Sequence, residues 1–200
     1  MTSQLSEMVM PENLAAWFYS KLNKGKILDI GCCTGIFGKY KPEGYTVYGI
    51  DVERDLLKGA SKYETVRYGN AEKRIPFKNA YFDGIFCRAV LEHVRDYRTF
   101  MKELNRVTKK NGILILTCGL PSFRYWDDYD HFMPHSPVGM RKMCEDYGFK
   151  VIKTHYQGNI PFFGMLHWQD KAIKLMSIPL FSKPFRSATI LICQKKKDIV

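Results

Sequence analysis

The chain has 200 residues, enough for one ordinary domain with a full hydrophobic core. A hydrophobic content of 46% with 14% aromatic residues excludes a disordered chain, and no apolar run is long enough for a membrane span. The formal net charge is +11, from 31 basic and 20 acidic residues. Because the lysines are scattered, we interpret this charge as a basic solvated surface, with RNA, anionic lipid or a phosphorylated partner as the alternative.

The predicted elements alternate between strands and helices. We expect a helix over residues 11–22, and then strands at 25–31, 45–51, 63–70, 81–90 and 112–119, with helices at 52–62 and 96–112 between them. The second of these helices would be closed by Gly112, with Lys109 and Lys110 favouring its dipole. Such alternation predicts an α/β fold with a doubly wound, mostly parallel sheet.

The pattern changes after Gly119. A helix is expected over 136–149, with Ser136 as N-cap and Pro137 in its first turn, then a strand at 150–157 and a final strand at 186–196. We treat the chain as a single domain, divided into an N-terminal helical cap (1–24), a core (25–157), a lid or insert (158–186) and a last strand (187–197).

Six cysteines show no CxxC spacing, and three of them, Cys87, Cys118 and Cys193, fall within or at the end of strand-like runs. The N-terminal residues lack the basic-then-apolar pattern of a secretory signal. We therefore expect reduced thiols and a cytoplasmic protein. The adjacent pair Cys32 and Cys33 lies inside a glycine-rich turn and is poorly placed for a disulfide or a shared metal.

That turn and one acid predict a ligand site. The turn from Asp29 to Gly38 follows the first strand, and Asp51 closes the second strand, 20 positions after Gly31. Ligands of open parallel sheets bind outside the carboxyl ends of the strands, where an acid can accept both hydroxyls of a ribose. Nicotinamide dinucleotides and S-adenosylmethionine both use this pairing. The absence of G-x-G-x-x-G and of Tyr-x-x-x-Lys favours S-adenosylmethionine.

Longer segments carry a family resemblance. "ILDIGCCTGIFG", "VYGIDVERDLL", "YGNAEKRIPFKNAYFDGIFCRAVLEHVRD" and "FMKELNRVTKKNGILILT" resemble, in order and spacing, the class I S-adenosylmethionine-dependent methyltransferases, and more closely the methyltransferase type 11 group. The resemblance covers roughly residues 25–150 and the final strand. It implies a Rossmann-like sheet of seven strands with the last strand antiparallel, S-adenosyl-L-methionine as cofactor and S-adenosyl-L-homocysteine as product.

The resemblance also implies a set of cofactor-binding residues. The methionine part would lie on the turn and on the loop after the fourth strand, the ribose on the acid of the second strand, and the adenine on the residues after the second and third strands. In that order the residues are Asp29, Gly31, Cys32, Gly35, Arg88 and Ala89, then Asp51, then Val52, Asn70 and Ala71. Cys33 departs from the family, which usually has glycine there.

Two histidines are candidates for the acceptor chemistry. His131 lies beyond the fifth strand, where the family places acceptor contacts, and it is a candidate base or acceptor contact. The alternative is a loop histidine bonded to Asp127 or Asp128. His93 matches a common family position and is a second catalytic candidate, or a histidine that bonds nearby backbone. The acids beside His131 are adjacent rather than convergent, so we expect no metal.

The acceptor itself is not named by any motif. We expect methyl transfer to a small-molecule or glycan- or lipid-linked acceptor, most simply at oxygen, with a tRNA or rRNA methyltransferase or a cofactor-binding protein without transferase activity as alternatives. Residues 159–186 are apolar and basic, and we interpret them as a lid or self-association surface. Contact with a membrane surface is the alternative for this segment.

Overall fold

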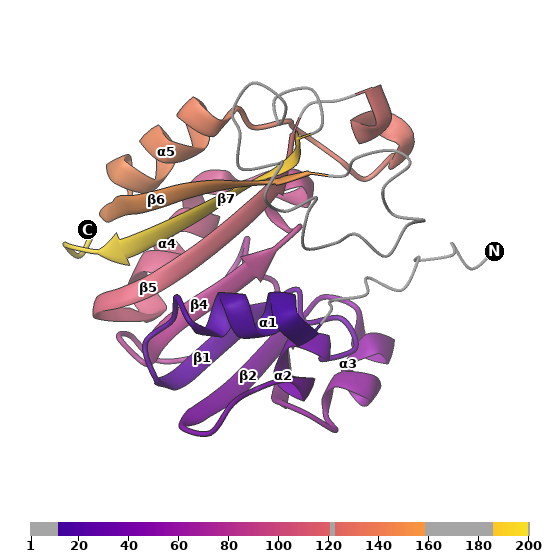
Figure 1. Ribbon diagram of the computed structural model, residues 1–200, viewed down its shortest axis with the longest axis vertical. Helices are drawn as coiled ribbons and strands as arrows, with labels where there is room; N and C mark the ends of the chain where they lie inside the picture. Colours follow the sequence, from indigo (N-terminus) through magenta and orange to yellow (C-terminus); the bar gives the residue numbers. More distant parts are fainter. Residues whose placement is uncertain (1–11, 121–122, 159–185, 200) are drawn as a thin grey trace.

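A computed structural model of the chain describes residues 12–120, 123–158 and 186–199, and it contains one seven-stranded sheet (Figure 1). The strand order is β3-β2-β1-β4-β5-β7-β6. All neighbours from β3 to β5 are parallel, whereas β7 is antiparallel to both β5 and β6. The predicted doubly wound sheet with an antiparallel last strand is therefore confirmed. The strands are β1 (Gly25–Ile30), β2 (Tyr45–Asp51), β3 (Thr65–Tyr68), β4 (Phe82–Arg88), β5 (Thr108–Gly119), β6 (Phe149–Gly158) and β7 (Arg186–Lys195).

Helices cover both faces of this sheet (Figure 1). Ile27 of β1 packs in a cluster with Phe18 of α1, while its neighbour Leu28 belongs to a cluster that contains Leu104 of α4 and Met140 of α5. Successive strand residues point to opposite faces, so α1 covers one face, and α4 and α5 cover the other. The helices are α1 (Glu12–Tyr19), α2 (Ile36–Lys39), α3 (Arg54–Ala60), α4 (Tyr97–Val107) and α5 (Pro137–Asp146), with 3₁₀ turns η1 (Leu91–His93) and η2 (Phe123–Asp127).

Two helices begin at side-chain caps. The Asp96 carboxylate accepts a hydrogen bond from the Thr99 backbone N–H at the start of α4. Ser136 accepts one from the Gly139 N–H at the start of α5, and Pro137 occupies the first turn, as the sequence predicts. Each cap satisfies an N–H that the helix itself leaves without a partner.

The predicted end of the helix at 96–112 is wrong. The helix ends at Val107, and Thr108 already belongs to β5, where it pairs with Phe82 of β4. The Thr108 hydroxyl donates to the Leu104 carbonyl at 2.6 Å, and Lys109 forms an ion pair with Asp83 at 2.7 Å rather than lying over the helix end. β5 thus begins at Thr108, four residues before Gly112. The β-branched Thr108 and the ion pair of Lys109 with Asp83 of β4 favour this earlier start.

The predicted ligand-binding residues lie at the carboxyl ends of the parallel strands β1 to β5, which form one edge of the sheet. Because β7 is antiparallel to β5, its first residue also lies at this edge, where Gly158 is paired with Arg186. The lid or insert is predicted over residues 158–186. Its first and last residues, Gly158 and Arg186, belong to β6 and β7, and residues 159–185 lie outside the described part of the chain. Among the described residues, no helix is long and apolar enough to cross a membrane.

Candidate cofactor and acceptor site

The turn after β1 is held against the end of β2. The backbone N–H groups of Gly31 and Cys32 both donate to the carbonyl of Ile50, at 2.9 and 3.2 Å. Gly31 and Gly35 have φ of 71° and 77°, the left-handed region that favours glycine. A Cβ at Gly31 would lie 2.5 Å from Cγ2 of Val90. The turn therefore presents bare backbone at the carboxyl end of β1, where a ligand can approach closely.

The two cysteines of the turn are not reactive groups. Cys32 is buried, and burial together with nearby carboxylates raises the pKa of its thiol. Burial and the charge of Asp51 raise the pKa of Cys33 to about 12. Both thiols therefore stay protonated near neutral pH, and all six cysteines of the chain are free. Cys33 has a φ of 48°, so it adopts the left-handed conformation that glycine would take more readily.

Asp51 is fixed at the end of β2 by two backbone hydrogen bonds. Its Oδ2 accepts from the Cys33 N–H and its Oδ1 from the Glu53 N–H, each at 2.9 Å. Each carboxylate oxygen has a second lone pair, which can accept a ribose hydroxyl. The next residue, Val52, is 51% exposed and offers an apolar surface beside this acid. This arrangement could hold a ribose on Asp51 and an adenine against Val52.

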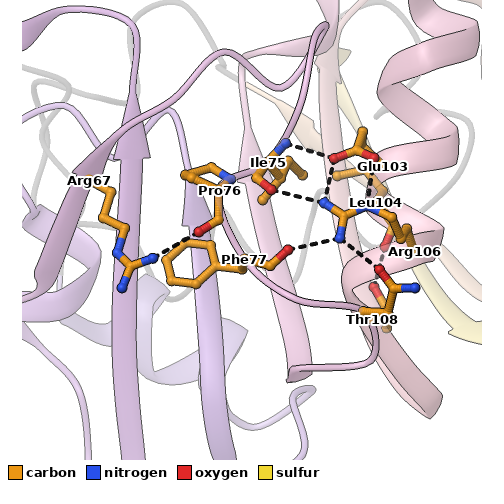
Figure 2. Close-up of polar contacts among 9 residues, drawn as sticks. Arg67, Ile75, Pro76, Phe77, Glu103, Leu104, Arg106 and Thr108 are labelled. Carbon is orange, nitrogen blue, oxygen red and sulfur yellow. Dashed lines mark hydrogen bonds and ion pairs between the residues drawn. The ribbon is translucent and has the colours of Figure 1, made fainter.

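The loop after β3 places Asn70 and Ala71 at the same edge. The Asn70 side-chain oxygen accepts from the Glu72 N–H at 2.8 Å, a turn-forming contact, and Ala71 is buried. Farther along, this loop is tied to α4 by Glu103 and Arg106, as Figure 2 shows. Glu103 accepts from the Ile75 N–H, while Arg106 donates to the carbonyls of Ile75 and Phe77.

The end of β4 contributes a half-buried cation, Arg88. Among the described residues, Nη1 of Arg88 is buried without a hydrogen-bond partner. Burial lowers the pKa of Arg88, and the negative charge of the Asp29 carboxylate partly opposes that shift. The next residue, Ala89, has a φ of 52°, and its N–H donates to the Thr117 hydroxyl at 3.1 Å. An unpartnered buried donor is costly and is satisfied when an anion binds there.

Beneath the turn lies an acid that the sequence did not indicate. Glu64 is buried and accepts from the Gly38 N–H at 2.8 Å, and burial raises its pKa to about 7. Burial and the neighbouring Glu64 also raise the pKa of Asp29 well above its ordinary value. Glu64 directly precedes a short strand, so its sequence pattern resembles that of an ordinary exposed strand end.

These groups fit S-adenosylmethionine. Its methionine part carries an ammonium and a carboxylate. The edge offers Asp29, whose raised pKa a bound ammonium would lower, for the first and the unsatisfied Nη1 of Arg88 for the second. Its ribose would bind Asp51, and its adenine would lie against Val52, within reach of the loop that begins at Asn70. The structure brings all ten predicted cofactor residues to the carboxyl ends of β1 to β4.

The two candidate catalytic histidines are brought into contact. The rings of His93 and His131 lie with centroids 4.8 Å apart, although the residues are distant in sequence. Nδ1 of His131 lies 2.5 Å from the Tyr125 carbonyl oxygen, and its Nε2 lies 3.9 Å from Oδ2 of Asp128. Nδ1 of His93 lies 3.3 Å from the carbonyl oxygen of Asp130. The two histidines meet because His93 follows the carboxyl end of β4 and His131 that of β5, and these strands are neighbours in the sheet.

Aromatic side chains flank His131 in the sequence. Trp126, Tyr129 and Phe132 are 59%, 90% and 51% exposed on the segment that follows β5. A groove of about 510 Å³ begins on the same segment at Met133 and His135 and continues between Tyr97 and α5. Neither His93 nor His131 is among the residues that line this groove.

The sequence is similar to a known protein family and to curated proteins. Residues 28–116 match the family described as "Methyltransferase domain". An uncharacterised protein of Methanocaldococcus jannaschii is 30% identical over 162 residues, which are 79% of this chain and 68% of that protein. A demethylmenaquinone methyltransferase of Geobacillus stearothermophilus is 34% identical, over 64% of this chain and 62% of its own length.

The fold is also shared with solved structures. A SAM-dependent methyltransferase from Archaeoglobus fulgidus superimposes with a TM-score of 0.69, covering 92% of this chain and 91% of its own, at 18% identity. At that identity the likeness shows a common fold.

Proposed function

The chain belongs to the class I S-adenosylmethionine-dependent methyltransferases, and from this premise we propose that it methylates a small or lipid-linked organic acceptor. The observation that carries the proposal is the carboxyl edge of β1, β2 and β4, where the glycine turn, Asp51 and the pair of Asp29 and Arg88 match the parts of the cofactor. The bound cofactor supplies an electrophilic methyl group on a sulfonium.

The chain's own residues would position this donor and exclude water from it. Methyl transfer is an in-line displacement, so holding the donor and acceptor in the correct geometry supplies much of the acceleration. Asp51 is held by two backbone N–H groups and would fix the ribose, while Arg88 and Asp29 would fix the two charges of the methionine part.

We place the acceptor on the side of His93 and His131. A hydroxyl acceptor must lose a proton, and Nε2 of His131 is the candidate that would accept it, because Nδ1 is occupied by the Tyr125 carbonyl. The exposed Trp126, Tyr129 and Phe132 favour an acceptor with an apolar part. This agrees with the similarity to a demethylmenaquinone methyltransferase, although that protein's substrate is not assigned to this chain. The free thiols agree with a cytoplasmic location.

A tritium-transfer assay tests this proposal. Labelled S-adenosylmethionine is incubated with the protein and with separate phenol or quinol, lipid-extract and RNA fractions. We expect label in an organic-soluble product, loss of transfer in Asp51→Ala, and little change in Asp55→Ala, a matched exposed acid on α3. His131→Ala should lower transfer and keep cofactor binding. Label found in the RNA fraction alone would overturn the proposed acceptor class.

A further inference from the structure

The two histidines, together with Asp128, also form a cluster of potential metal ligands. His93, Asp128 and His131 each offer a potential ligand atom, and these atoms all lie within 4.8 Å of one another. His93 comes from the turn after β4, whereas Asp128 and His131 come from the segment after β5. The sequence alone predicts no metal, because the acids beside His131 are adjacent and Pro134 prevents His131 and His135 from sharing a helix face. Sequence spacing does not place His93 near this group.

We propose that His93, Asp128 and His131 bind a divalent transition metal ion of the zinc class. Two imidazoles and one carboxylate suit Zn²⁺, Co²⁺, Ni²⁺ or Fe²⁺, whereas Mg²⁺ and Ca²⁺ prefer all-oxygen ligands. Three protein ligands leave at least one coordination position open, as in catalytic rather than structural zinc sites.

In both rings the Nδ1 atom lies against a backbone carbonyl oxygen, and the Nε2 atom is left for another ligand. Nδ1 of His131 lies against the Tyr125 carbonyl and Nδ1 of His93 against the Asp130 carbonyl. A carbonyl oxygen only accepts, so each Nδ1 must carry the proton, and each Nε2 is left with a lone pair. Metal-ligating histidines almost always donate their second N–H to a carbonyl or carboxylate in this way. This pattern is independent of the closeness of the three residues.

The cluster has room to contract around an ion. In a tetrahedral site with zinc–nitrogen bonds of about 2.0–2.1 Å, ligand atoms are separated by about 3.3 Å. The present spacing of up to 4.8 Å is larger by an amount that side-chain rotation covers. His93 is exposed and the Asp128 side chain is 51% exposed, whereas the buried Tyr125 backbone holds His131. Oδ1 of Asp128 accepts from the Asp130 N–H at 3.0 Å, which leaves Oδ2, 3.9 Å from Nε2 of His131, for an ion.

A metal here would change the role of His131. Its Nε2 cannot both ligate an ion and accept a proton, so the bound ion would instead lower the pKa of an acceptor hydroxyl in its open position. This catalytic use rests on the proposed function. The metal site itself stands on the geometry alone.

The test is a Co²⁺ titration of the chelator-treated full chain, read by the visible absorption of the bound ion and by displacement with Zn²⁺. We expect one equivalent to bind, with affinity reduced at least tenfold in His93→Ala, Asp128→Asn and His131→Ala. Asp130→Asn, which makes the same charge change on the same segment, should bind as the wild type does. The far-ultraviolet circular dichroism spectrum, measured on every variant, shows that each one is folded, independently of S-adenosylhomocysteine binding.

Two results would overturn the site: no Co²⁺ signal with the wild type, or equal signals in the wild type and His131→Ala. Failure of the proposed function is a separate result. A chain that binds Co²⁺ but no S-adenosylhomocysteine would keep the metal site and lose the methyltransferase mechanism.

Discussion

Cys33 places a side chain in a left-handed turn, with a φ of 48°. This conformation costs a non-glycine residue about 1–2 kcal/mol, and glycine avoids that cost but loses more entropy on folding. Cys33→Gly should therefore keep the free energy of unfolding within about 1 kcal/mol of the wild type. It should keep or tighten S-adenosylmethionine binding, measured by calorimetry.

Cys33→Ala is the matched control, because it removes the thiol and retains the Cβ and the strain. It should behave like the wild type. If both variants lose binding to the same extent, the thiol itself contributes to the site and the strain explanation fails.

The buried Glu64 makes the stability of the folded chain depend on pH. Its pKa is raised from 4.5 to about 7, so the folded chain binds this proton more tightly than the unfolded chain. The stabilisation is complete below pH 4.5 and is lost as the pH rises through 7. Glu64→Gln keeps an acceptor for the Gly38 N–H and cannot ionise. The fall in unfolding free energy between pH 5 and 8 should shrink by up to about 3 kcal/mol, measured by urea denaturation.

The exposed Glu43 provides the comparison for this effect. Glu43→Gln should retain the pH dependence of the wild type. An unchanged slope in Glu64→Gln would mean that this carboxyl is not the group that titrates.

At the scale of elements, α4 holds the loop that carries Asn70 and Ala71. Arg106 and Glu103 form an ion pair at 2.6 Å with side chains only 18% and 11% exposed, and together they bind the backbone of Ile75 (Figure 2). Arg106→Met leaves Glu103 without its cation, and breaking such a buried pair costs about 3–5 kcal/mol. We expect a loss of this order in urea denaturation and weaker S-adenosylmethionine binding.

Arg98 is the control for that substitution, because it lies on the same helix with an exposed side chain. Arg98→Met should change neither quantity appreciably. Equal losses in the two variants would mean that helix charge, rather than the link to the loop, matters.

An element or site can be predicted from the sequence when the signals that define it are local. The cofactor edge was predictable because a strand, a glycine turn and a strand-end acid are local patterns, and Asp29, Gly31 and Asp51 come together once the strands are parallel. The end of α4 was not, because Thr108 enters β5 through pairing with a distant strand. Likewise, nothing local in the sequence brings His93 to His131.

For the whole molecule, ligand binding should be visible as stability. A ligand that binds only the folded state stabilises it by about 2.7 kcal/mol at one hundred times its dissociation constant. For a domain of this size that corresponds to a rise in Tm of about 5–10 °C. S-adenosylhomocysteine should produce this shift in differential scanning calorimetry, and Asp51→Ala should abolish it. A shift of equal size in Asp51→Ala would show that the ligand binds elsewhere.

The antiparallel β7 has one further consequence. Gly158 and Arg186 are paired neighbours, so the segment 159–185 joins two strands that a short turn would also join. The sheet therefore sets no minimum length for this connection, whereas each parallel crossover elsewhere must span the sheet. Insertion, trimming or exchange of this segment leaves the register of every strand unchanged. The segment can therefore be exchanged in an experiment without re-registering the strands that carry Asp29, Asp51 and Arg88.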